Sequence, residues 1–309
     1  MRRRPAALIA AAAIAAAAAA PQVAAEGTLR VCLDETTPYS MHHGKDGGGF
    51  DMMVADAIAK RLGRKLEVQW FETEVDIDAD PVTQQNALMS DGHCELVGGY
   101  TLYRDGLGKP GAATARMPSY EGMKPGDRRR YVALGTMVPS RAYHSVPLTV
   151  VLGPKVADRK IGGIVDLQGI ALGAEQTTVA DTVLMNYGGG RYVNQITHVA
   201  PGRNELLPRL ELGEYDAVML PLNRFDIYRR EHPATRLKAS GFYHRIGFNF
   251  GFAGLSTSKE LIDQVNAAIV DMLAKGEFVA LAQAAGVTFL PPREPEVLEH
   301  ISIFDFYRD

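Results

Sequence analysis

Cysteine and tryptophan are scarce in this sequence, which has two cysteines and one tryptophan among 309 residues. Positive charge is not in surplus either, because the formal net charge is −3 at pH 7. Proteins bind a nucleic-acid backbone through clustered lysine and arginine, so we expect no nucleic-acid partner. Beyond the first 25 residues, no apolar run reaches the ~18 residues that span a bilayer, so we expect that part of the chain not to be membrane-embedded.

The sequence motifs of several large enzyme classes are also absent. There is no G-x-S-x-G, no H-E-x-x-H and no phosphate loop of the G-x-x-x-x-G-K type. The acidic run 76–80 (DIDAD) starts like a calcium loop, but Pro81 and Ala87 stand where such a loop needs glycine and glutamate. We therefore predict no enzymatic activity, no cofactor and no metal site. An enzyme in which a glutamate of a cleft, such as Glu175, acts as an acid is the alternative.

The first 25 residues have the layout of a secretory signal peptide. Arginines at positions 2–4 precede the apolar run Leu8–Ala20, and Val23-Ala24-Ala25 offers a cleavage site before Glu26. We therefore expect residues 1–25 to be removed and the chain to be exported to the periplasm. Loss of the three arginines takes the net charge from −3 to −6. The chain that is left is longer than the chains that usually fold around a single hydrophobic core, so we expect two lobes.

The two cysteines, Cys32 and Cys94, belong to a chain that we expect in an oxidising compartment. A disulfide between them is the natural expectation, because two cysteines alone make a weak metal site. The bond would close a loop over a separation of 62 residues and contribute about 4 kcal/mol on the loop-entropy model.

Short apolar runs alternate with amphipathic segments in the first third of the chain. Residues 28–33 and 66–71 are expected to be strands, and residues 51–62 (DMMVADAIAKRL) a helix that ends at Gly63. This order predicts an α/β fold with a mostly parallel sheet covered by helices on both faces. The alternation continues with a helix at 83–89 and a strand at 95–98.

The pattern breaks at residues 105–130, which are rich in glycine and proline, and we expect a long surface loop inserted there. Strand-like runs return at 131–138 and 148–152. A second series of elements follows, with strands expected at 170–173, 217–220 and 248–255, and helices at 178–187, 206–212, 225–231 and 259–275.

Several segments, taken in their order, resemble the bacterial extracellular solute-binding proteins of family 3. They are 29–32 (LRVC) with 38–39 (PY), 49–51 (GFD), 166–169 (DLQG) with 176–178 (QTT), 210–218 (LELGEYDAV) and 265–276. This resemblance implies the type II periplasmic-binding-protein fold, in which two doubly wound α/β lobes are joined by a two-strand hinge.

The same resemblance implies how the chain is divided. Residues 26–144 and 247–309 would form lobe 1, and residues 145–246 lobe 2, with crossings near 141–147 and 244–248. Closure of such lobes traps a ligand in the cleft. The implied function is capture of a small polar solute, amino-acid-like or an organic acid, for an ABC-type importer with its permease in the inner membrane.

Ligand-binding residues follow from the family pattern. In its amino-acid binders an arginine in a T-x-x-R segment holds the α-carboxylate, and the segment from Thr101 to Arg104 has this form. Thr177 and Thr178 precede a helix whose free amides suit an anion. The alternatives are a solvated side chain for Arg104 and N-capping alone for the two threonines. The expected ligand-binding set is Asp34, Tyr39, Thr101, Arg104, Thr177 and Thr178.

One departure from the amino-acid binders keeps a second interpretation open. Those proteins place an acidic residue five positions after the aspartate of D-A-V, where this chain has Pro221. Residues 31–34 (VCLD), 92–95 (GHCE) and 140–145 (SRAYHS) resemble a subgroup of the same fold that is associated with quinoprotein alcohol (methanol) dehydrogenases. The alternative function is therefore that of an accessory partner of a periplasmic dehydrogenase.

Overall fold

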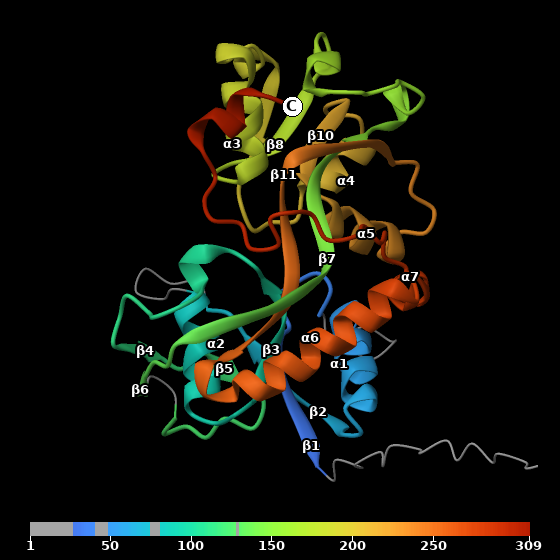
Figure 1. Cartoon of the computed structure of the whole chain (residues 1–309). Coiled ribbons are helices and arrows are strands. Elements are labelled where there is room, and N and C mark those ends of the chain that lie inside the picture. Colours follow the sequence, from blue (N-terminus) through green and yellow to red (C-terminus); the bar gives the residue numbers. More distant parts are fainter. Residues whose placement is uncertain (1–26, 41–48, 75–80, 128–129) are drawn as a thin grey trace, which may run out of the picture.

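The computed structural model describes residues 27–40, 49–74, 81–127 and 130–309. The expected signal peptide and the acidic run 76–80 lie outside the described residues. The molecule is built on a nine-stranded mixed sheet with the order β5-β2-β1-β3-β11-β7-β10-β8-β9. Figure 1 shows two halves, each with helices around its part of the sheet, and β7 and β11 running from one half to the other. The expected α/β fold class is confirmed.

The first half forms around three parallel strands. Strand β1 pairs in parallel with β2 on one side and with β3 on the other. Leu29, Val31 and Leu33 on one face of β1, and Cys32 on the other, are fully buried, as expected for a strand covered on both faces. The elements of this half are β1 (Thr28–Asp34), α1 (Gly49–Arg61), β2 (Lys65–Glu72), α2 (Pro81–Ser90), β3 (Leu96–Thr101), α6 (Lys259–Ala274) and α7 (Glu277–Ala285).

The second half repeats the arrangement. Strand β8 pairs in parallel with β9 and with β10, and apolar side chains of the strands and helices form separate core clusters there. Strand β9 was not among the expected elements, because its four residues carry no distinct apolar run. The elements are β8 (Leu172–Glu175), α3 (Val179–Asn186), β9 (Ile196–Val199), α4 (Leu206–Glu211), β10 (Ala217–Pro221) and α5 (Leu222–Glu231).

Two long antiparallel strands connect the halves. Strand β7 (Met137–Leu152) pairs with β10 of the second half, and β11 (Lys238–Leu255) pairs with β3 of the first half. The two strands also pair with each other along most of their length, with Gly247 opposite Pro147. The expected crossings at 141–147 and 244–248 therefore lie inside continuous strands, which the sequence had shown only as shorter separate runs.

The residues after α7, 286–309, form what we call the C-terminal segment. It follows the β7–β11 pair and ends on the second half (Figure 1). The amide of Ser145 donates to the carbonyl of Leu290, and that of Ile164 to a carboxylate oxygen of Asp309, at 3.0 and 2.5 Å. Ile301 and Phe306 pack against the core of the second half. The expected lobe 1 included all of 247–309, whereas Ile301 and Phe306 are partly buried against the other half and Ile303 and Phe304 are exposed.

The stretch 105–130 is not the structureless loop that its glycines and prolines suggested. It contains β4 (Thr114–Arg116), which pairs with β6 (Tyr131–Ala133), and β5 (Ser119–Tyr120), which pairs with β2. The side chains of Arg116 and Ser119 both reach the carboxylate of Glu74, at 2.6 and 2.9 Å. The insertion is thus an added edge of the first half.

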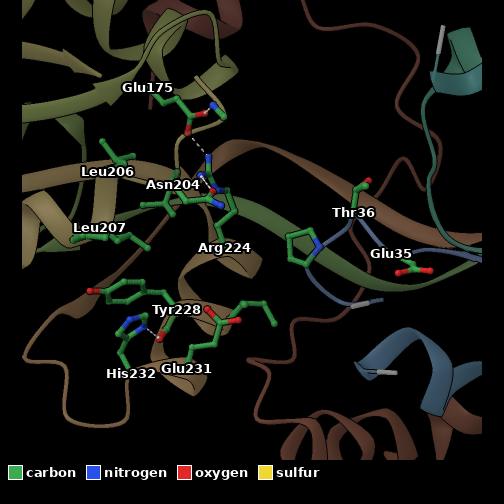
Figure 2. A pocket seen from close by; sticks show the side chains of 15 residues that line it. Glu35, Thr36, Glu175, Asn204, Leu206, Leu207, Arg224, Tyr228, Glu231 and His232 are labelled. Carbon is green, nitrogen blue, oxygen red and sulfur yellow. Dashed lines mark hydrogen bonds and ion pairs between the residues drawn. The ribbon is translucent and has the colours of Figure 1, made fainter. Parts of the chain in front are cut away.

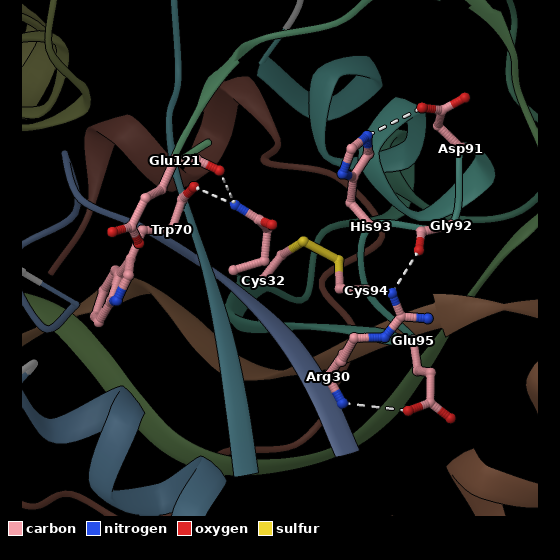
Figure 3. Close-up of a disulfide and its surroundings, with 10 residues drawn as sticks. Arg30, Cys32, Trp70, Asp91, Gly92, His93, Cys94, Glu95 and Glu121 are labelled. Atoms are coloured by element: carbon pink, nitrogen blue, oxygen red, sulfur yellow. Dashed lines mark hydrogen bonds and ion pairs between the residues drawn. A yellow bond between two sulfur atoms is a disulfide. The ribbon is translucent and has the colours of Figure 1, made fainter. Parts of the chain in front are cut away.

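A disulfide joins Cys32 to Cys94, with a Cα–Cα distance of 5.6 Å, as predicted from the sequence. It ties the middle of β1 to the turn before β3 (Figure 3). The side chain of Arg30 reinforces this junction by donating to the carbonyl of Gly92 at 3.0 Å. The bond therefore fixes the end of α2 against the sheet of the first half.

Candidate functional site

A cavity of about 550 Å³ lies between the two halves, and we call it the cleft cavity. The first half contributes Glu35, Thr36 and Pro38, which follow directly after β1. In the second half, Glu175 ends β8 and Leu220 lies near the end of β10. The carboxyl ends of parallel strands from both halves therefore meet here, which is where open α/β sheets bind ligands.

The second-half wall is organised by an ion pair between Glu175 and Arg224 of α5 (Figure 2). Glu175 also accepts a hydrogen bond of 2.9 Å from the amide of Gly202, and Arg224 reaches Asn204 at 3.4 Å. Burial acts to raise the pKa of Glu175, but the hydrogen bond from Arg224 and the amide of Gly202 lower it below its ordinary value. An ionised carboxylate at neutral pH does not suit the role of a general acid.

An aromatic surface lies further along α5. The rings of Tyr228 and His232 stack with centroids 4.2 Å apart and an interplanar angle of 17°. Nδ1 of His232 lies 3.0 Å from the carbonyl of Tyr228, which fixes the histidine ring against the helix end. Both residues and the neighbouring Glu231 line the cleft cavity, whose floor is apolar at Leu206 and Leu207. The cavity thus joins carboxylates, a guanidinium, an aromatic face and an apolar floor.

Asp34, the first of the sequence-predicted residues, lies behind the cavity wall. Its buried carboxylate accepts hydrogen bonds from the amide and hydroxyl of Thr36, at 2.9 and 2.7 Å, and from the hydroxyl of Thr73 at 2.5 Å. Asp34 therefore shapes the turn that presents Glu35 and Thr36 to the cavity. Its own oxygens are used within the first half.

Tyr39 connects the first half to α5. Its hydroxyl donates to Asp226 at 2.9 Å, and Asp226 also accepts from the amide and hydroxyl of Thr288, at 2.9 and 2.8 Å. Burial, followed by the charge of Asp226, raises the pKa of Tyr39 well above its ordinary value. Tyr39 is buried and does not line the cleft cavity. Through this hydrogen bond Tyr39 holds α5, which lines the cleft cavity, in place.

The other predicted residues divide between two places. Thr178 caps α3, accepting from the amide of Asp181 at 3.1 Å, and its hydroxyl donates to the carbonyl of Glu175 at 2.9 Å. Thr177 precedes it, exposed, with φ of 65°. Thr101 ends β3, opposite Phe250 of β11. The structure therefore brings the two threonines close to the cleft cavity through Glu175, although neither lines it.

Arg104 lies apart from the cleft cavity. It is exposed, and its guanidinium forms an ion pair with Glu299 of the C-terminal segment. Its amide donates to the carbonyl of Leu298 at 2.9 Å, which places it beside the path of that segment. The residues that the sequence did not single out are Asn204, Arg224, Tyr228 and His232. Arg224 follows the strand expected at 217–220 and Tyr228 lies on the helix expected at 225–231, whereas Asn204 and His232 had no such signal.

Among the described residues, no group of three or more histidine, cysteine, aspartate or glutamate side chains is placed to hold a metal ion. Within the same residues, no helix combines the length and apolar character needed to cross a bilayer.

No known family model matches the chain. Comparison with solved structures nevertheless defines its fold. The L-cystine solute receptor of Neisseria gonorrhoeae, in its unliganded open conformation, aligns with a TM-score of 0.57 and 20% identity over 87% of this chain and 97% of the receptor. Substrate-binding domain 2 of GlnP from Lactococcus lactis, also open, aligns with a TM-score of 0.55 and 16% identity over 92% of this chain and 99% of that domain. The chain thus has the type II fold of the periplasmic solute-binding proteins.

Among individual proteins, the chain is similar to Protein MoxJ of Methylorubrum extorquens. The identity is 44% over 45 residues, a match that spans 15% of this chain and 14% of MoxJ.

Proposed function

We propose that this protein is a periplasmic solute-binding protein, not an enzyme, that captures a small polar solute in the cleft cavity for an ABC-type importer. The observation that carries the proposal is that the cleft cavity takes its walls from both halves. In this proposal, residues 26–144 and 247–300 form one lobe, and residues 145–246 with 301–309 form the other. Closure about the β7–β11 pair would bury the solute from water.

The lining of the cleft cavity supports an amino-acid-like solute over a simple organic acid. Glu175, Glu231 and Arg224 are among the charged residues that line it. With Glu175 paired to Arg224, Glu231 adds a second carboxylate to the lining that suits an ammonium group. The stacked face of Tyr228 and His232 suits the apolar part of such a solute and adds a cation–π surface.

The proposal is tested by a thermal-shift screen of amino acids, amines and organic acids on the mature protein. A solute at 100 times its Kd stabilises the folded state by about 2.7 kcal/mol. The substitution Arg224→Gln leaves Glu175 without its partner, and the added negative charge would repel the carboxylate of an amino-acid solute, so the shift should be abolished. Arg236→Gln serves as the matched control, because Arg236 is exposed and does not line the cleft cavity. A screen without any shift, or a shift that Arg224→Gln leaves intact, would count against the cleft cavity.

A second candidate is the role of an accessory partner in a periplasmic quinoprotein (methanol) dehydrogenase system. The similarity to MoxJ supports it, together with the segments 31–34 and 92–95, which the disulfide of Cys32 and Cys94 joins. Affinity purification of the tagged protein from periplasm and solubilised membranes separates the candidates. Recovery of a dehydrogenase favours the second, and recovery of permease subunits favours the first.

A further inference from the structure

A second cavity, of about 270 Å³, lies between the β7–β11 pair and the C-terminal segment, and we call it the C-terminal cavity. It shares no lining residue with the cleft cavity. Ser145 of β7 and Asn249 of β11 form its strand wall, and Arg293 and Leu298 belong to the segment that covers it. A volume below the 300–1,000 Å³ of drug-sized ligand sites suits a small molecule.

Ser145 brings an unused hydroxyl to this cavity. The residue is 1% exposed, and its Oγ has no hydrogen-bond partner among the described residues. Ser145 stands directly opposite Asn249 in the antiparallel pair, so both side chains lie on the same face. The amide of Asn249 on that face donates to the carbonyls of Arg293 and Glu296, at 2.7 and 3.0 Å. The hydroxyl of Ser145 therefore faces the C-terminal segment and the cavity.

Arg293 places in this cavity a guanidinium that has no carboxylate partner among the described residues. Its one side-chain hydrogen bond among the described residues runs from Nη1 to the carbonyl of His244, at 3.0 Å. No ion pair of Arg293 occurs in that part of the chain, whereas Arg104 and Arg141 of the same region pair with Glu299 and Glu296. Burial desolvates the guanidinium of Arg293 in part and lowers its pKa from the ordinary value. A half-buried guanidinium with unused donors is the chemistry that recognises an anion.

The remaining lining limits which anion fits. Asp305 is engaged by Arg245 at 3.4 Å and by the amide of Ser302 at 2.9 Å, and Glu294 is exposed. These two carboxylates would repel an anion of high charge. Ile246, Leu298 and Ile301 add apolar surface to the cavity. A single carboxylate with a short aliphatic tail satisfies both conditions.

We propose that the C-terminal cavity binds a small aliphatic monocarboxylate, with its carboxylate held by Arg293 and Ser145 and its tail against Ile246, Leu298 and Ile301. Such a ligand would bridge the β7–β11 pair and the C-terminal segment, both of which run between the halves. The site is independent of the solute proposed for the cleft cavity.

The test uses the mature protein with sodium butyrate as the probe. Sodium phosphate and sodium chloride at equal ionic strength serve as controls for other classes of anion. We expect saturable butyrate binding in two-dimensional amide NMR, with shifts at Ser145, Asn249 and Arg293, and none of these with the other salts. Arg293→Gln and Ser145→Ala should each weaken butyrate binding by roughly tenfold to a hundredfold, the loss typical of a hydrogen bond to a charged group.

Two variants show whether a loss of butyrate binding comes from the C-terminal cavity itself. Ser145→Ala removes a buried hydroxyl without a partner, so its melting temperature should be unchanged or raised while its affinity falls. Arg236→Gln should retain the full butyrate affinity. Retained butyrate binding in Arg293→Gln, loss in Arg224→Gln of the cleft cavity, equal binding of phosphate, or no saturable shift with butyrate would each overturn the proposal. Of these results, only loss of butyrate binding in Arg224→Gln bears on the solute of the cleft cavity, because it would place butyrate there.

Discussion

The hydroxyl of Tyr39 donates a 2.9 Å hydrogen bond to Asp226, and this bond joins the loop after β1 to helix α5 of the second half. Tyr39→Phe would leave that buried carboxylate with the two donors of Thr288 and the more distant Arg229. We expect a loss of about 1–3 kcal/mol in the free energy of unfolding, measured in urea.

Tyr131→Phe is the control for this loss, because Tyr131 is 66% exposed and should change stability by less than about 0.5 kcal/mol. If the two variants unfold at the same urea concentration, the bond between Tyr39 and Asp226 does not hold α5.

His144 makes the protein sensitive to acid. It is fully buried among Tyr39, Phe50 and Phe289, and neither ring nitrogen has a hydrogen-bond partner among the described residues. Burial lowers its pKa to about 3, and the nearby carbonyl of Leu290 offsets this only in part. Between pH 6.5 and about 3, His144 is therefore protonated in the unfolded chain but neutral in the folded chain.

The stability that depends on the neutral His144 is fully present above pH 6.5 and is lost as the pH falls through that window, by about 5 kcal/mol in all. His144→Leu should keep stability at pH 7 and lose less of it in acid, in urea titrations between pH 7 and 4. An equally steep acid loss in the variant would mean that His144 is not its source.

The disulfide should contribute to stability in the range of other natural bonds. Replacing Cys32 and Cys94 together by serine is expected to cost about 2–5 kcal/mol. Urea unfolding of the oxidised wild type, the reduced wild type and the variant gives the measurement. The reduced wild type should approach the variant, and a variant as stable as the oxidised protein would contradict the prediction.

The last residues of the C-terminal segment should stabilise the second half. Deletion of residues 301–309 exposes the core that Ile301 and Phe306 cover, and it leaves Nε2 of His244 without the carbonyl of Arg308 at 2.8 Å. Amide hydrogen exchange should rise in α3 and around Ile164, and stay unchanged in α1 and β2. An equal rise in both halves would show that the segment acts on the whole fold.

The sequence predicted the individual helices and strands better than the way in which they connect the two halves. Periodicity located α1, α6 and the strands of both halves except β9, because each of these buries one stripe or run of apolar residues. It could not show that residues 137–152 form a single strand, since Pro139, Ser140 and Arg141 interrupt the apolar pattern where β7 passes between the halves. The course of residues 301–309 depends on tertiary contacts alone.

The candidate site was predicted only in part. Thr178 and Asp34 lie one residue or one hydrogen bond away from the cavity lining, because the ends of strands are visible in the sequence. The T-x-x-R segment has the form of a family motif, but its arginine, Arg104, forms an ion pair with Glu299, which is distant in the sequence. Arg224 and Tyr228 line the cavity by virtue of the direction of α5, which no local pattern determines.

The path of the C-terminal segment decides where reporter groups would be informative. Tyr307 is 41% exposed, and its neighbour Asp309 is bonded to Ile164. In the proposed closure, a fluorophore at position 307 would travel with α3, whereas α7, shortly before it in the chain, packs against α1. Energy transfer between dyes at 307 and on α6 would therefore read the separation of the lobes directly, within one continuous stretch of about fifty residues.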